Sequence, residues 1–141
     1  MQFHTKTLIF ETSQPILLLD ITHEVRMFAE SFGLTHGMLT VASEHTTLGI
    51  VLNERCDELQ KDMVDFLSRL APSKGDYRHN RVAQDGRVNA HSHLLSLLIP
   101  SAQTIVLING HLALGKWQSV FLAELDGPRP LRKVHLTLMG V

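Results

Sequence analysis

Residues Thr104–Leu125 read Thr-Ile-Val-Leu-Ile-Asn-Gly-His-Leu-Ala-Leu-Gly-Lys-Trp-Gln-Ser-Val-Phe-Leu-Ala-Glu-Leu. The β-rich run Thr104–Ile108 leads into Asn109-Gly110, a pair typical of the tight turn of a hairpin. A long alternating run follows from His111 to Leu125, and a last run extends from Lys133 to Met139. These runs predict that the C-terminal part of the chain is antiparallel sheet.

The N-terminal half mixes strand and helix patterns. Strands are predicted at Phe3–Thr12, Ile16–Leu19, Gly37–Ser43 and Leu48–Asn53. Helices are predicted at Asp20–Phe32 and Asp57–Leu70, and a third begins near Asn89. Three helices and six or seven strands without regular βαβ alternation predict one α+β domain spanning residues 1–141, with a mainly antiparallel sheet.

Composition limits the classes of protein. Hydrophobic residues make up 44% of the 141 residues and charged residues 19%, values typical of a soluble globular domain. The formal net charge of −1 excludes the basic footprint of a nucleic-acid-binding protein. The single cysteine, Cys56, excludes an internal disulfide and a Cys-x-x-Cys zinc site. With neither a signal peptide nor a membrane-spanning run, the sequence predicts a cytoplasmic protein without a membrane partner.

A histidine-bearing segment, Asn89–Leu98, is the first candidate for chemistry. Asn89 is the predicted N-cap, and the leucines that follow His93 are predicted to bury one broad face of a helix. Free N–H groups at a helix start attract anions and disfavour a protonated imidazole. On a helix, His91 and His93 point about 200° apart. One of them therefore faces the site, and we expect it to be His93, unless the backbone is extended there and both chelate one ion.

A second polar cluster, Glu44-His45-Thr46-Thr47, lies between two predicted strands, and Asn53 ends the second of them. His45 could meet His79 and His93 to form the three-imidazole set that zinc favours. His79 lies in Ser73–Val88, a long polar segment that is either a functional loop or partly disordered.

A third group surrounds the predicted strand Lys116–Asp126. Its alternation places Gln118, Val120, Leu122 and Glu124 on one face, and Trp117 on the other as a core residue. Arg129 follows the turn Asp126-Gly127-Pro128 and offers the fork geometry that binds phosphate or carboxylate.

Taken together, these motifs resemble the YjbQ-like family, also called the secondary thiamine-phosphate synthase family. The resemblance covers nearly the whole chain and is carried by His45-Thr46-Thr47, Asn53-Glu54, Asp62, Tyr77-Arg78-His79, Asn89 to Leu94, Gly115 to Gln118 and Glu124 to Arg129. It implies a homotrimer with a polar pocket near the subunit contacts, and thiamine-phosphate synthase activity. It also favours His93 over His91.

The main hypothesis is therefore an enzyme in which a thiazole phosphate displaces pyrophosphate from an activated pyrimidine. The expected catalytic residues are His45, His79, His93 and Glu124, and the three histidines are the expected ligands of any divalent metal, zinc or magnesium. Thr46, Asn53, Asn89, His91, Gln118 and Arg129 are expected to bind the small phosphorylated substrate. The alternatives are a metal-dependent hydrolase of a small phosphorylated substrate and a trimeric, non-enzymatic protein that binds a small anion.

Overall fold

The computed structural model describes all residues, 1–141. The strands are β1 (Gln2–Thr12), β2 (Leu17–Asp20), β3 (His36–Ser43), β4 (Leu48–Glu54), β5 (Ala102–Ile108), β6 (His111–Leu112), β7 (Gln118–Glu124) and β8 (Arg129–Gly140). The helices are α1 (Thr22–Glu30), α2 (Asp57–Leu70), α3 (Ala90–Ser96) and the short 3₁₀ helix η1 (Arg78–Arg81). The predicted α+β domain with three α-helices is confirmed.

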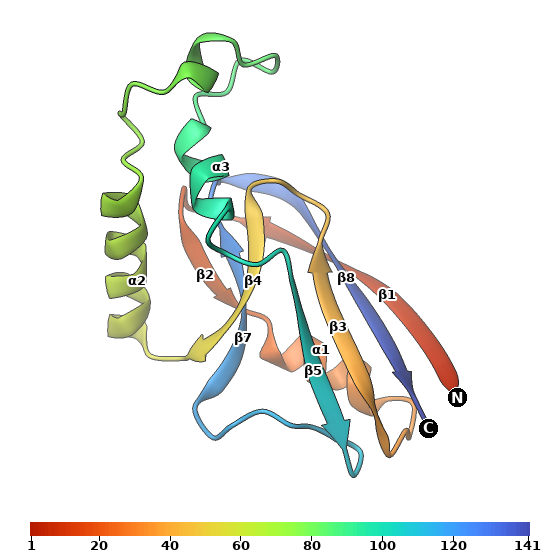
Figure 1. Ribbon diagram of the computed structural model, residues 1–141. Coiled ribbons are helices and arrows are strands. Elements are labelled where there is room, and N and C mark those ends of the chain that lie inside the picture. Colours follow the sequence, from red (N-terminus) through yellow and green to blue (C-terminus); the bar gives the residue numbers. More distant parts are fainter.

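The strands form two antiparallel sheets (Figure 1). The larger sheet has the order β1-β8-β3-β5-β6, and the smaller has the order β2-β7-β4. β1 and β8 are paired over almost their whole length, so that Gln2 lies opposite Gly140 and the two termini are adjacent. β1, β3 and β8 thus form a continuous platform on which the remaining elements are arranged.

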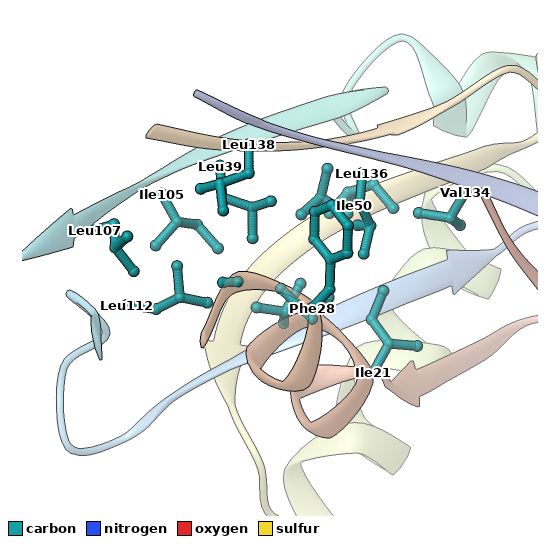
Figure 2. Close-up of a cluster of buried hydrophobic side chains, with 14 of the residues drawn as sticks. Ile21, Phe28, Leu39, Ile50, Ile105, Leu107, Leu112, Val134, Leu136 and Leu138 are labelled. Atoms are coloured by element: carbon teal, nitrogen blue, oxygen red, sulfur yellow. The ribbon is translucent and has the colours of Figure 1, made fainter. Parts of the chain in front are cut away.

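The main core lies between the two sheets (Figure 2). Leu39 and Leu138 point into it from the larger sheet, and Ile50 and Leu122 from the smaller one. Phe28 of α1 packs into the same core. The short helix and the two sheets therefore share one apolar interior.

Strand β7 is buried on both faces. Val120 and Leu122 face the core between the sheets, whereas Phe121 and Ala123 belong to a separate cluster against which Met63 of α2 packs. The two faces follow the predicted alternation, but both are buried.

The alternating run His111–Leu125 contains two strands separated by a loop, and the strand predicted at Lys116–Asp126 is present as β7, two residues shorter at each end. The Asn109-Gly110 turn is present with both residues at positive φ, but β6 ends at Leu112 and β7 begins only at Gln118. Trp117 lies in the intervening loop and is 65% exposed, so its predicted place in the core is wrong. Its ring lies under Lys116 Nζ, which is 4.8 Å from the ring centroid.

The predicted apolar helix faces are only partly correct. α2 has the predicted bounds, but of the apolar side chains that recur at helical spacing along it, Leu67 is buried whereas Phe66 and Leu70 are exposed. α3 ends at Ser96, and of its leucines only Leu95 is buried. Because the helix stops after seven residues, the helical spacing does not continue to Leu98.

The segment between α2 and α3 forms a loop at one end of the molecule, beyond the two sheets (Figure 1). It contains η1, and the Asn80 side chain ties that turn to α3 by accepting a hydrogen bond from the Ala90 amide at 3.0 Å. None of the helices has both the length and the apolar content that crossing a bilayer requires.

Candidate functional site

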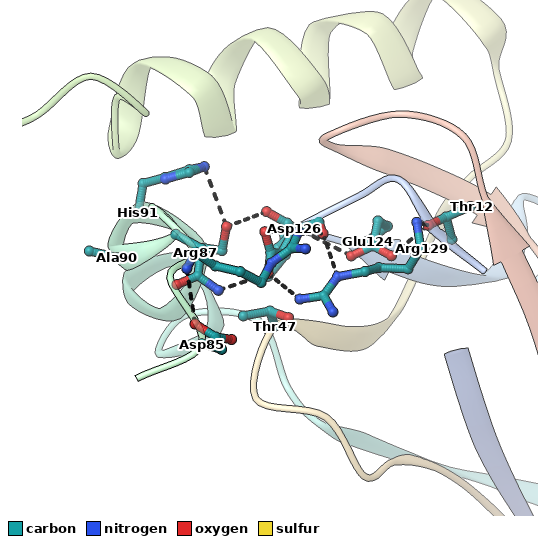
Figure 3. A network of polar contacts seen from close by, with 12 residues as sticks. Thr12, Thr47, Asp85, Arg87, Ala90, His91, Glu124, Asp126 and Arg129 are labelled. Carbon is teal, nitrogen blue, oxygen red and sulfur yellow. Dashed lines mark hydrogen bonds and ion pairs between the residues drawn. The ribbon is translucent and has the colours of Figure 1, made fainter. Parts of the chain in front are cut away.

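A buried carboxylate, Asp126, lies at the centre of the largest polar network (Figure 3). It lies in the connection between β7 and β8, and its Oδ2 accepts hydrogen bonds from Asn89 Nδ2 at 2.8 Å and Arg129 Nη2 at 2.6 Å. Arg87 Nη2 donates to Oδ1 at 3.1 Å. These bonds anchor Arg87, near the end of the segment between α2 and α3, and Asn89, at the start of α3, to the β7–β8 connection.

The network keeps Asp126 ionised. Burial alone would raise the pKa of this carboxyl, but the hydrogen bonds from Arg87, Asn89 and Arg129 outweigh it and hold the pKa below its ordinary value of 3.8. The carboxylate is thus already compensated by two guanidinium groups of its own chain.

A second buried pair, Glu124 and Arg132, links the two sheets. Glu124 of β7 is fully buried, and both of its oxygens accept hydrogen bonds from the Arg132 guanidinium of β8. Thr12 Oγ1 donates to Glu124 Oε2 at 2.7 Å, and the Asp126 amide donates to Oε1 at 2.9 Å. Burial raises the pKa of Glu124, but these hydrogen bonds from Arg132, Asp126 and Thr12 bring the pKa below its usual range.

These contacts engage three residues that the sequence assigned to catalysis or anion binding. Glu124 has all its observed partners inside the protein and no exposed surface. The Arg129 side chain directs Nε at the Asp126 carbonyl and Nη2 at its carboxylate. Asn89 occupies the position before α3, but its side chain makes no capping bond and donates to Asp126 instead. Asn89 is thus the N-cap residue, as predicted, but the predicted capping bond from its side chain is absent, and the Asn80 side chain bonds the Ala90 amide instead.

The segment between α2 and α3 brings His79 next to His93 of α3, and both were predicted to be catalytic. The rings of His79 and His93 meet edge to face, with centroids 5.0 Å apart and an interplanar angle of 80°. Both line a hollow of about 560 Å³ together with Arg78, and both also line an adjoining hollow of about 450 Å³. We call this the His79–His93 site.

His45 does not join this pair within the chain. Its Nε2 accepts a hydrogen bond from the Lys133 amide at 3.0 Å, so the proton of the neutral ring is on Nδ1. Burial, and then the charge of Arg132, lower the pKa of His45, and the ring is neutral near pH 7. Beside it, Glu44 accepts a hydrogen bond from His135 Nε2 at 2.8 Å on the surface of the larger sheet.

The residues do not fit a three-ligand metal centre within one chain. No group of three or more histidine, cysteine, aspartate or glutamate side chains is arranged to hold an ion. Binding at His45 Nε2 would also require the loss of its bond to the Lys133 amide. The His79–His93 pair offers two imidazoles at most, one fewer than the three protein ligands of a typical catalytic zinc site.

The remaining predicted residues are dispersed. Thr46 is exposed, and the Oδ1 of Asn53, the last residue but one of β4, accepts a local hydrogen bond from the Glu54 amide. Gln118 Oε1 accepts from the Gly115 amide at 2.8 Å and closes the loop before β7. His91 and His93 both lie on α3, and His91 lines a different cavity from His93, as expected for residues two apart on a helix.

Three of the residues that build this region were not predicted: Thr12, Arg87 and Arg132. Arg132 had a usable signal, because it shares strand parity with the buried Val134, Leu136 and Leu138 and so points inward. Thr12 had the same kind of signal, because it shares strand parity with Leu8 and Phe10, which pack against the core.

Known proteins resemble this chain along nearly its whole length. The family model described as "UPF0047 protein YjbQ-like" matches residues 6–141. A UPF0047 protein of Methanothermobacter thermautotrophicus is 39% identical over 140 residues, covering 99% of this chain and 94% of the relative. The UPF0047 protein YugU of Bacillus subtilis is 34% identical, with 96% and 98% covered.

Solved structures show the same fold. A YbjQ-like protein from Sulfolobus solfataricus superimposes with a TM-score of 0.94 at 28% identity, covering 99% of both chains. A protein from Aeropyrum pernix superimposes with a TM-score of 0.91 at 34% identity, covering 98% of this chain and 99% of its own. On the strength of the family match over residues 6–141 and of relatives that match end to end, this chain belongs to the YjbQ-like UPF0047 family.

Proposed function

We propose that this protein is an enzyme acting on a small phosphorylated substrate at the His79–His93 site, with thiamine-phosphate synthase-like transferase activity. The observation that supports this is the pair of imidazoles 5.0 Å apart, which lines two adjoining hollows of about 560 and 450 Å³. These are sizes typical of small-molecule sites. The carboxylates of Glu124 and Asp126, by contrast, are bonded within the protein.

The proposed reaction places its electrostatic demand on the leaving group. When a thiazole nitrogen displaces pyrophosphate from the pyrimidine, negative charge grows on the departing oxygen. Arg78 lines the larger hollow beside both imidazoles, and its side chain has no hydrogen-bond partner within the protein. In this proposal Arg78 binds phosphate oxygens in place of Arg129, and His79 and His93 donate hydrogen bonds or a proton to the leaving group.

We also propose that the chain assembles as a homotrimer. In support, the outer face of the larger sheet is not covered by any helix and carries exposed apolar side chains from four strands: Phe3, Ile9, Met38, Val106, Ile108 and Met139. An exposed apolar face of this kind is typical of a protein interface. The single, exposed Cys56 supports a reducing compartment such as the cytoplasm.

The test is a turnover assay with the pyrimidine pyrophosphate and the thiazole phosphate, following pyrophosphate release by phosphorus NMR. We expect His93→Ala to lower kcat/KM by about 100-fold or more, the usual contribution of a general acid or base. The matched control is His23→Ala, because His23 is an exposed histidine of α1 with no side-chain partner. Full turnover by His93→Ala would contradict the assignment.

The same experiment separates the alternatives. Metal content is measured on protein purified without a chelator or an affinity tag. Metal-dependent release of phosphate from a simple phosphate ester would favour the hydrolase, with the third ligand supplied from outside this chain. Saturable binding of pyrophosphate without turnover or metal would favour the non-enzymatic anion-binding protein.

A further inference from the structure

The larger hollow of the His79–His93 site has an apolar part that the proposed reaction leaves unassigned. Of the residues that line this hollow, Arg78 and the two histidines are used to bind phosphate or to protonate the leaving group. Tyr77, from the residues just before η1, and Leu94 of α3 also line it. These two side chains come from the two segments between which the hollow lies, and Tyr77 is the only tyrosine of the chain.

The Tyr77 ring is held in one place by the turn that precedes it. Its Oη donates a hydrogen bond to the Pro72 carbonyl at 2.9 Å. The same carbonyl accepts a bond from the Gly75 amide at 3.1 Å, and the Tyr77 amide donates to the Gly75 carbonyl at 3.1 Å. The ring is therefore ordered before a ligand arrives, so a ligand that contacts it does not have to immobilise it.

Gly75 makes this arrangement possible. A Cβ atom on Gly75 would lie 2.5 Å from both Cε2 and Cζ of the Tyr77 ring, closer than real Cβ contacts allow. Glycine is thus needed for the close approach of the ring to the backbone. One side of the ring packs against the turn, and the ring also lines the hollow. Tyr77 thus presents an ordered aromatic surface to the site.

Leu94 presents a second apolar surface to the hollow. Its side chain is 43% exposed, whereas the next residue of α3, Leu95, is buried in a core cluster. A flat apolar ligand that fills the hollow removes surface of both Leu94 and Tyr77 from water, which favours binding. Tyr77 adds a preference for an aromatic ring, because aromatic pairs are more stable than their buried area alone accounts for.

The charges around the hollow favour an anion. Asp76 lines the hollow too, but its Oδ1 is paired with Arg81 Nη2 at 2.6 Å. Arg78 has no side-chain partner within the protein, so its guanidinium is free to bind phosphate. An aromatic surface in the same hollow as a free guanidinium suits a ligand that joins a flat ring to a phosphate.

We propose that Tyr77 is a specificity-determining residue of the His79–His93 site, whose ring packs on the aromatic ring of a phosphorylated ligand. This inference rests on the proposed function, because it uses the same site and the same phosphate contact to Arg78. It concerns binding alone, so it can be tested without turnover.

The experiment compares phenyl phosphate with cyclohexyl phosphate at a pH where both are dianions. The two ligands have the same charge and similar size, and the saturated ring is no less apolar, so burial of apolar area alone does not favour phenyl phosphate. We expect wild-type protein to bind phenyl phosphate about threefold to tenfold more tightly, the value of one aromatic pair. We also expect nuclear Overhauser effects between the phenyl protons and the Tyr77 ring protons, whose signals are unambiguous because the chain has one tyrosine.

Variants separate contact with the ligand from a structural role. Tyr77→Leu keeps an apolar side chain but removes the ring, so it should abolish the preference for phenyl phosphate. Tyr77→Phe keeps the ring and should retain the preference. The readout is the ratio of two dissociation constants measured on one variant, so a loss of folded protein affects both ligands equally. Phe66→Leu is the matched control and should keep the wild-type ratio, because Phe66 is an exposed aromatic residue of α2 that does not line the hollow.

Equal binding of the two ligands by the wild type, or a preference that persists in Tyr77→Leu, would overturn the inference. If the pyrophosphate-release assay shows turnover alongside either result, the proposed function stands and only the role of Tyr77 is refuted. The expected preference without turnover supports the role of Tyr77 and refutes the enzymatic proposal. If neither ligand changes the His79 and His93 signals, the inference fails, and the turnover assay alone decides the proposed function.

Discussion

Asn80 Oδ1 accepts a hydrogen bond from the Ala90 amide at 3.0 Å, and this contact joins η1 to the first residue of α3. It performs the capping that the sequence pattern assigned to Asn89. Because His79 immediately precedes Asn80 and His93 lies one turn into α3, the bond also holds the two imidazoles at their edge-to-face distance of 5.0 Å.

Replacing Asn80 with alanine should therefore affect both stability and the His79–His93 site. We expect a loss of about 1 kcal/mol in the free energy of unfolding, as for other lost helix caps, measured by urea denaturation. Asn53→Ala is the matched control, because Asn53 is exposed and bonds only the next amide. If the two variants lose the same stability, the Asn80 contact is not a cap of any consequence.

Breaking the Glu124–Arg132 pair should cost far more stability than breaking a surface ion pair. We expect Arg132→Met to cost about 3–5 kcal/mol, because it leaves Glu124 charged and fully buried. Lys61→Met removes the partner of the exposed Glu58 and should cost at most about 1 kcal/mol. Denaturant melts of both variants provide the comparison, and equal losses would contradict the importance of burial.

Acid should destabilise the fold through Asp126. The pKa of this carboxyl is lower in the folded protein than its ordinary value of 3.8, so its stabilising effect is complete above that pH and is lost as the pH falls through the folded-state pKa. Asp126→Asn should cost about 1–3 kcal/mol at pH 7 by leaving two guanidinium groups uncompensated. Its stability should also fall less steeply than that of the wild type below pH 4. If the stability of Asp126→Asn and of the wild type falls equally steeply below pH 4, the proposed role of Asp126 is contradicted.

His45 should make a separate contribution at milder pH. Its folded-state pKa lies below the ordinary value of 6.5, so the unfolded chain takes up a proton first as the pH falls. Stability is therefore lost as the pH drops below 6.5, and the loss is complete at the folded-state pKa. His45→Gln should flatten this part of the stability profile, measured by thermal melts between pH 7.5 and 5. His23→Gln, a change at an exposed histidine, should keep the wild-type profile.

The architecture could be predicted from the sequence where a local pattern and the tertiary environment agree. The α2 bounds, the Asn109-Gly110 turn and the strands of the first half follow from spacing, capping and turn residues. The sequence pattern did not show the loop that separates β6 from β7, nor that β7 is buried on both faces from Val120 to Glu124. Neither fact has a local signature.

The candidate site, like the fold, could be predicted from the sequence only in part. The opposite orientation of His91 and His93 follows from the helical repeat, and their two different cavities confirm it. By contrast, strand parity shows that Arg132 points inward but not that it bonds the Glu124 carboxylate, because the two residues lie on strands of different sheets and only the fold brings them together. The Asp126–Arg129 pair is local, since the two residues are three apart in the connection between β7 and β8, but the sequence analysis assigned Arg129 to the substrate instead.

The double burial of β7 has a consequence for variation within this protein. Most strands have an exposed face on which side chains can change at little cost, but from Val120 to Glu124 every position faces either the core between the sheets, the α2 side or an ion pair. A larger side chain at Ala123 would meet the α2 side, and a smaller one at Leu122 would leave a cavity. Mutational drift in this protein should therefore be slowest along β7, and a deep mutational scan should find its least tolerant residues there.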